Sequence, residues 1–147
     1  MKEKQAEYLE RLFAELTGEG LKAEIVPGMG RWQIGDTLRM LMPVGVKGEE
    51  VLLEIAAARF DDDLSFISLY SAIIPETKNT GVSLHQLNLI CPIGAFGVAG
   101  NQVYHKYSLI FDDYSDVDLL IYDTVRALAG ISYIIAVHLP ELLKAFL

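Results

Sequence analysis

The chain has 147 residues, of which 52% are hydrophobic and 22% are charged, a composition that suits one domain with its own core and excludes intrinsic disorder. The formal net charge is −8 and the 12 basic residues are dispersed, which argues against nucleic acid and membrane surfaces as partners. The lone cysteine, Cys91, excludes an intramolecular disulfide. Without a signal-peptide pattern at the N-terminus, we expect a cytoplasmic protein.

The first third of the chain predicts a helix followed by short strands. A 3.6-residue hydrophobic period indicates an amphipathic helix over residues 2–17, which Gly18 ends. Alternation over residues 21–25 then predicts a short strand. Residues 37–43 also alternate, but Pro43 marks an edge or an end, so this strand assignment stays open.

The middle of the chain predicts two long strands and a helix. Residues 51–60 are apolar on both faces, which is typical of a central strand, and residues 64–74 are rich in aromatic and β-branched side chains. Pro75 closes the second strand. Residues 80–91 carry apolar side chains at helical spacing, and Pro92 ends that predicted helix.

The last third predicts a hairpin and a long helix. Residues 95–99 and 103–111 flank Gly100-Asn101, a favourable pair for a tight turn. The final helix opens near Ser115, with Asp118 at the spacing of a capping box, and runs at least to Val137.

The fold class predicted by this order is α+β, with the elements α-β-β-β-α-β-β-α in one domain spanning residues 1–147. Short turns join most consecutive strands, so we expect a mainly antiparallel sheet with helices packed on one side.

Motifs for catalysis and for metal binding are weak. No two histidines have ligand spacing, and the acidic runs at 61–63 and 112–118 suit turns and a helix cap better than a cation loop. Ser83, with His85 two residues later, resembles an incomplete nucleophile elbow without an acid partner. We therefore expect no enzyme, no metal and no cofactor.

Two features favour contact with another protein. Trp32, the single tryptophan, lies in a glycine-rich stretch and is either an exposed anchor or part of the core. The last helix is apolar around most of its circumference, although a helix on a sheet needs only one apolar stripe. That surplus indicates either a second buried side, in a dimer or under a partner, or a helix set deep in a groove.

The segment from Leu84 to Asp113, LHQLNLICPIGAFGVAGNQVYHKYSLIFDD, resembles the middle of YbjN-like proteins, with Leu87-Asn88 as a characteristic pair. YbjN-like domains are similar in fold to class I type III secretion chaperones, which are small, acidic and usually dimeric. The resemblance implies a single YbjN-like or secretion-chaperone-like domain without catalytic residues. The chaperones would imply binding of an unfolded segment, and YbjN-like proteins a regulatory role.

The leading hypothesis is thus a non-catalytic, chaperone-like module that binds a polypeptide segment on apolar surface, as a homodimer. The residues expected at the dimer or partner interface are Leu84, Leu87, Ile90, Leu128, Ile131 and Ile135. The alternative is a small-molecule-binding or regulatory domain with a pocket between sheet and helices, lined by Phe66, Tyr70 and Tyr107. An enzyme using Ser83 or His85 comes third.

Overall fold

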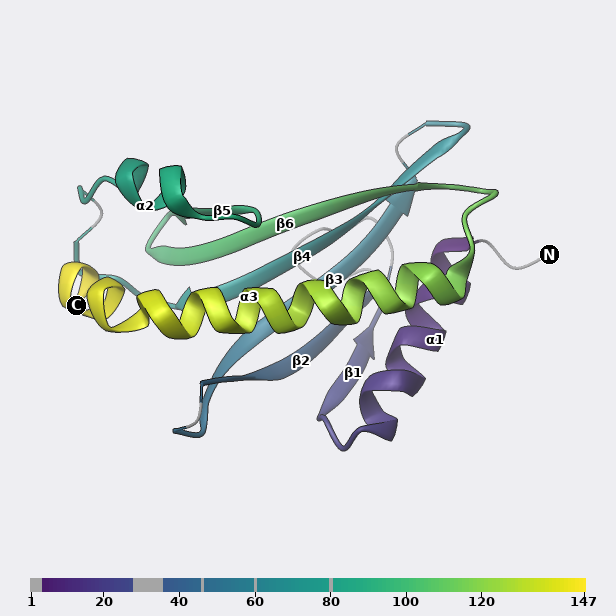
Figure 1. Cartoon of the computed structure of the whole chain (residues 1–147), viewed down its shortest axis with the longest axis horizontal. Coiled ribbons are helices and arrows are strands. Elements are labelled where there is room, and N and C mark those ends of the chain that lie inside the picture. The colour runs from purple at the N-terminus through teal and green to yellow at the C-terminus, as the bar shows by residue number, and fades with distance from the viewer. Residues whose placement is uncertain (1–3, 28–35, 46, 60, 80) are drawn as a thin grey trace.

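The computed structural model describes residues 4–27, 36–45, 47–59, 61–79 and 81–147. The elements in chain order are α1 (Lys4–Gly18), β1 (Ala23–Val26), β2 (Thr37–Val44), β3 (Glu49–Arg59), β4 (Leu64–Ile74), α2 (His85–Ile90), β5 (Ala95–Ala99), β6 (Gln102–Asp112) and α3 (Val117–Phe146). In Figure 1, α3 runs along the sheet, and α1 lies beside the N-terminal part of α3.

The six strands form one antiparallel sheet in the order β1-β2-β3-β4-β6-β5, which confirms the α+β class. The open assignment at residues 37–43 is resolved as a full strand, β2, which pairs with β3 from Thr37↔Ala56 to Val44↔Glu49. Four strands therefore precede α2, one more than in the predicted order. The chain leaves β4 through α2 and returns as β5 and β6, so β6 lies between β4 and β5.

The sheet has a covered face and an open face. On the covered face, alternate residues of each strand pack against α1 and α3 and form the core. The largest fully buried side chains are Tyr8, Phe146, Leu12, Leu38, Leu53, Ile55, Ile67, Leu69, Ile131, Ile135, His105 and Val44. The predicted stripe on the first helix is confirmed, since Tyr8, Leu9, Leu12 and Leu16 are buried.

Two helix boundaries differ from the sequence expectation. The predicted helix over residues 80–91 contracts to α2 (His85–Ile90), because Ser83 Oγ accepts the N–H of His85 and residues 81–84 stay extended or irregular. The last helix is capped by Asp116 rather than Ser115: the Asp116 carboxylate accepts the N–H groups of Asp118 and Leu119. Helix α3 continues through Pro140 to Phe146.

A buried hydrogen bond connects α1 to α3. Thr124 Oγ donates its hydrogen to the Leu120 carbonyl at 2.7 Å, so it accepts the hydroxyl of Tyr8, also at 2.7 Å. Both side chains are fully buried, and burial raises the pKa of the Tyr8 phenol far above its usual value. The phenol therefore stays protonated and acts as the donor that orients α1 on α3.

The directions of these bonds predict unequal costs for two substitutions. Thr124→Val leaves the buried Tyr8 hydroxyl without an acceptor and should cost about 2 kcal/mol. Tyr8→Phe leaves Thr124 still donating to Leu120 and should cost about 1 kcal/mol. Urea unfolding of both variants measures the difference. A Tyr8→Phe variant less stable than Thr124→Val would contradict the assigned donor.

Candidate peptide-binding edge

The outer edge of β5 is blocked by an asparagine. Asn88, on α2, donates from Nδ2 to the carbonyl of Phe96 at 2.9 Å and accepts the N–H of Phe96 at its Oδ1 at 2.7 Å. This amide side chain completes the hydrogen bonding of Phe96 as a neighbouring strand would. Asn88 belongs to the Leu87-Asn88 pair singled out in the sequence, and this contact gives it a structural role.

The contact also fixes which backbone groups of β6 point outward. Phe96 directs its N–H and C=O away from β6. Because these directions alternate along a strand, Ala95 and Gly97 direct their own N–H and C=O groups toward β6. Their partners are Lys106 and Tyr104, so the even-numbered residues of β6 point away from β4. The alternation continues at Ser108, Ile110 and Asp112.

Strand β5 covers only the first part of that edge. It pairs with β6 from Gln102 to Lys106, and beyond Lys106 no described strand pairs with the outer side of β6 (Figure 1). The N–H of Asp112 is satisfied locally, because it donates to Ser115 Oγ at 3.0 Å. Ser108 and Ile110 thus present two N–H and two C=O groups along this stretch, the β6 open edge.

Gly94 explains why β5 stops where it does. Its backbone has φ +66°, and a Cβ at this position would lie 2.3 Å from the Lys106 carbonyl oxygen. Only glycine fits such a close approach in this conformation. The chain before Ala95 therefore turns off the sheet instead of continuing along β6, and the edge beyond it stays open.

Apolar side chains flank the β6 open edge on both faces of the sheet. On the open face, a groove of about 310 Å³ is lined mainly by Leu64, Phe66, Ser108 and Ile110, and Ile110 is 74% exposed. On the covered face, Tyr107 and Leu109 are only partly buried against the core. An added strand would find apolar neighbours for its side chains on either face.

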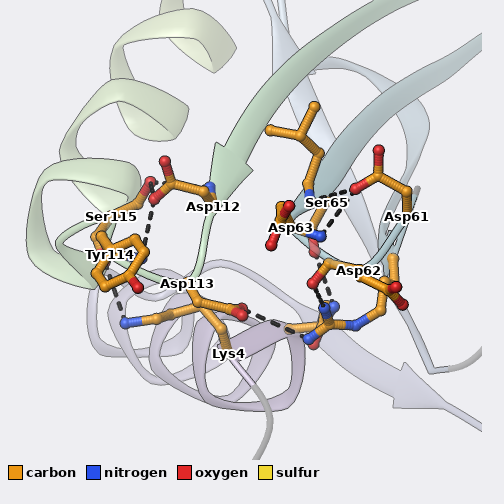
Figure 2. Close-up of polar contacts among 12 residues, drawn as sticks. Lys4, Asp61, Asp62, Asp63, Ser65, Asp112, Asp113, Tyr114 and Ser115 are labelled. Atoms are coloured by element: carbon orange, nitrogen blue, oxygen red, sulfur yellow. Dashed lines mark hydrogen bonds and ion pairs between the residues drawn. The ribbon is translucent and has the colours of Figure 1, made fainter.

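One end of this edge is strongly acidic. Figure 2 shows the β3–β4 turn and the β6–α3 turn side by side, with Asp61, Asp62, Asp63, Asp112 and Asp113 gathered there. Two carboxylates hold their own turns: Asp61 accepts the N–H groups of Asp63 and Leu64, and Asp112 accepts the N–H of Tyr114.

The basic side chains near this end do not balance its charge. Arg59 contacts Asp113 and the Asp62 carbonyl, and Lys4 donates to the Ser115 carbonyl (Figure 2). Among the described residues, five aspartates therefore face two basic side chains, Arg59 and Lys4, so this end of the edge favours a cation.

The six residues expected at an interface fall into two groups. Leu84 and Leu87 are partly buried and Ile90 is exposed; together they line a hollow of about 390 Å³ between α2 and the C-terminal end of α3. Their role in an interface stays a prediction. The other three, Leu128, Ile131 and Ile135, are buried inside the chain's own core, so the free surface of α3 is made by other residues.

The expected small-molecule pocket does not assemble from its predicted residues. Tyr107 is paired with Leu69 and shares the covered face with it, whereas Phe66 and Tyr70 lie on the open face. The three aromatic side chains thus occupy opposite sides of the sheet. Trp32 and the neighbouring glycine-rich stretch lie outside the described residues.

The single cysteine lies near a buried histidine, but the pair lacks the geometry of a nucleophile and its base. Cys91 Sγ and His105 Nε2 are 3.9 Å apart, and both face the Ile93 carbonyl, at 3.1 and 2.7 Å. That carbonyl only accepts, so Nε2 carries the proton and has no lone pair for the thiol. Burial lowers the pKa of His105, which keeps its ring neutral.

Ser83 and His85 do not form a catalytic pair either. Ser83 Oγ accepts the backbone N–H of His85, at 3.3 Å, and both side chains are exposed. Among the described residues, no group of three His, Cys, Asp or Glu side chains is arranged to hold a metal ion. Helix α3 is long and apolar enough to cross a bilayer by length and composition, a property that it shares with buried core helices.

Comparisons with protein-family models, with curated proteins and with solved structures give no match for this chain.

The buried, neutral His105 predicts a loss of stability in mild acid. Its pKa is lower in the folded state than the unfolded value of about 6.5, so the unfolded chain binds the extra proton as the pH falls through 6.5. The free energy of unfolding should fall between about pH 7.5 and pH 5.5, by at most about 1.4 kcal/mol per pH unit for this group.

The comparison that isolates His105 is its substitution by Gln, which retains a donor for Ile93. Urea unfolding of His105→Gln should depend less on pH than that of the parent chain. His85→Gln, at an exposed position, should leave the dependence unchanged. Equal pH dependence in the parent and in His105→Gln would show that another group carries it.

Proposed function

We propose that this chain is a non-catalytic, chaperone-like module that binds an extended polypeptide segment as an added strand on the β6 open edge. The observation that carries the proposal is the set of outward N–H and C=O groups of Ser108 and Ile110, which no described strand pairs. Strand addition supplies partners for such groups, and pockets for alternate side chains then give specificity.

The surroundings of the edge define the chemistry of the segment. Side chains that point to the open face would lie in the groove beside Phe66 and Ile110, and those on the other face would lie beside Leu109. The segment should therefore carry apolar residues at alternate positions. Its end beside Asp112 should carry Lys or Arg, because the surplus of aspartates there attracts a cation.

Three further observations support a binding role over catalysis. The thiol of Cys91 has no available base, and Ser83 is engaged with the backbone of its own turn. The resemblance of residues 84–113 to YbjN-like proteins, and through them to secretion chaperones, points to the same kind of activity. The outward N–H and C=O of Phe96 in β5 are hydrogen-bonded by the Asn88 side chain, whereas those of Ser108 and Ile110 in β6 have no described strand beside them.

Selection of peptides tests the proposal. A displayed library of random dodecapeptides is selected on the immobilised chain, and the affinities of enriched peptides are measured by fluorescence anisotropy. We expect alternating apolar residues with a basic residue near one end. Enriched peptides that lack alternating apolar residues, or that bind in the hollow between α2 and the C-terminal end of α3, would contradict the proposed site.

A proline substitution then tests the edge itself. Ser108→Pro removes an outward N–H without breaking the β4–β6 ladder, so the fold should persist while peptide affinity falls at least about tenfold. Ser108→Thr, which retains the N–H, is the matched control and should bind like the parent. Thermal unfolding verifies the fold of both variants, and unchanged affinity in a folded Ser108→Pro would refute strand addition at this edge.

A further inference from the structure

The outward face of α3 carries an apolar stripe that the core does not use. Its members are Leu119, Tyr122, Arg126, Ala129, Tyr133 and Val137. Their spacing of three and four residues places them on one line along the helix, opposite the buried row that includes Leu128 and Ile135. Leu119 is 62% exposed and Tyr133 is 71% exposed, so the stripe is open along its length.

We propose that two copies of this chain associate through this α3 stripe, with the two helices antiparallel and a two-fold axis close to Ala129. This assembly goes beyond the proposed function and does not use the β6 open edge. A closed two-fold interface requires a surface that is complementary to itself. The order of side chains along the stripe and the distribution of charge along the helix both meet that requirement.

The smallest side chain of the stripe lies near its middle. Larger side chains lie on both sides of Ala129, namely Leu119, Tyr122 and Arg126 before it and Tyr133 and Val137 after it. Two copies can therefore approach most closely at the alanine, where the helix axes cross, while larger side chains pack on either side. Helix pairs of this kind have axes 8–10 Å apart, a separation that depends on small residues at the crossing point.

Charge favours a second copy of the chain in the antiparallel orientation. The net charge of the chain is −8, yet the stripe contains no acidic side chain and its only charge is Arg126. Acidic residues gather at the start of α3, including Asp116 and Asp118, and Lys144 lies in its last turn. A parallel pair would place these acidic first turns side by side, whereas an antiparallel pair separates them by the length of the helix.

Arg126 adds a specific contact. Its guanidinium lies 5.4 Å from the centre of the Tyr122 ring in the same helix. In the antiparallel pair, Tyr133 of the second copy is the aromatic residue whose position along the helix axis is closest to that of Arg126. The guanidinium can therefore be enclosed between two rings. The cation is thereby accommodated without an acidic partner.

The mass in solution tests the interface. Light scattering of the parent chain at high micromolar concentration should give twice the 16.3 kDa of one chain. Tyr133→Glu should give one chain, because its carboxylate would be buried against the second copy. Ile90→Glu, on the exposed side of α2, is the matched control and should keep the doubled mass. A single-chain mass for Ile90→Glu with a doubled mass for Tyr133→Glu would overturn the proposal and place the dimer on α2.

Cross-linking tests the register without depending on a destabilised variant. In a Cys91→Ala background, Ala129→Cys should form a disulfide-linked dimer under mild oxidation, because the two positions meet near the axis. Leu119→Cys should not, because antiparallel packing holds its two copies about 30 Å apart. Efficient cross-linking at Leu119→Cys, or none at Ala129→Cys, would refute the arrangement.

Flotation with phosphatidylcholine vesicles distinguishes a lipid-binding surface from a dimer interface. If the parent chain has the mass of one copy and floats with the vesicles, and Tyr133→Glu abolishes the flotation, the stripe binds lipid and the dimer is refuted.

Discussion

The length difference between two paired strands shapes the surface of this protein. Every residue in a strand directs its N–H and C=O to one side of the strand, and these groups need partners. β6 has 11 residues and β5 has 5, so β5 can satisfy only part of the outer side of β6. Natural sheets usually protect such edges, and an unprotected stretch is a template for another chain. Here, the blocked and the open part of one edge are only a few residues apart.

The two surfaces proposed for contact have different physical characters. The β6 open edge offers directional backbone groups, flanking apolar side chains and an acidic end, which suits an extended segment with a defined pattern. The α3 stripe offers side chains alone on a rigid helix, which suits another rigid surface. Because the stripe faces away from the sheet, a dimer formed through it would leave the β6 open edge of each copy accessible.

Much of the fold is predictable from the sequence, because local signals agree with the tertiary arrangement. The pair Gly100-Asn101 correctly places the turn of the hairpin, whose register begins at Ala99↔Gln102. The sequence could not assign a core face to residues 51–60, because they are apolar on both faces and β3 is buried on both. Helix α2 was overestimated, because apolar spacing over residues 80–91 reflects packing of Leu84 and Leu87 on the core and not helical backbone. The apolar surplus on the last helix was also visible, but periodicity alone does not tell which side meets the sheet.

The candidate site itself was not predictable. The open edge depends on where the chain leaves β6, and that is decided by the close approach of Gly94 to the Lys106 carbonyl, a contact between residues 12 positions apart. The sequence does contain the two determinants, Gly94 and Asn88, but nothing local marks them as edge-forming. The most direct test of the β6 open edge is the rate at which individual backbone amides exchange hydrogen with solvent, measured by NMR. The amides of Ser108 and Ile110 should exchange quickly while those of Tyr107, Leu109 and Phe111 are protected, and a selected peptide should protect the first two. Protection of Ser108 and Ile110 in the free chain equal to that of Leu109 would contradict an open edge.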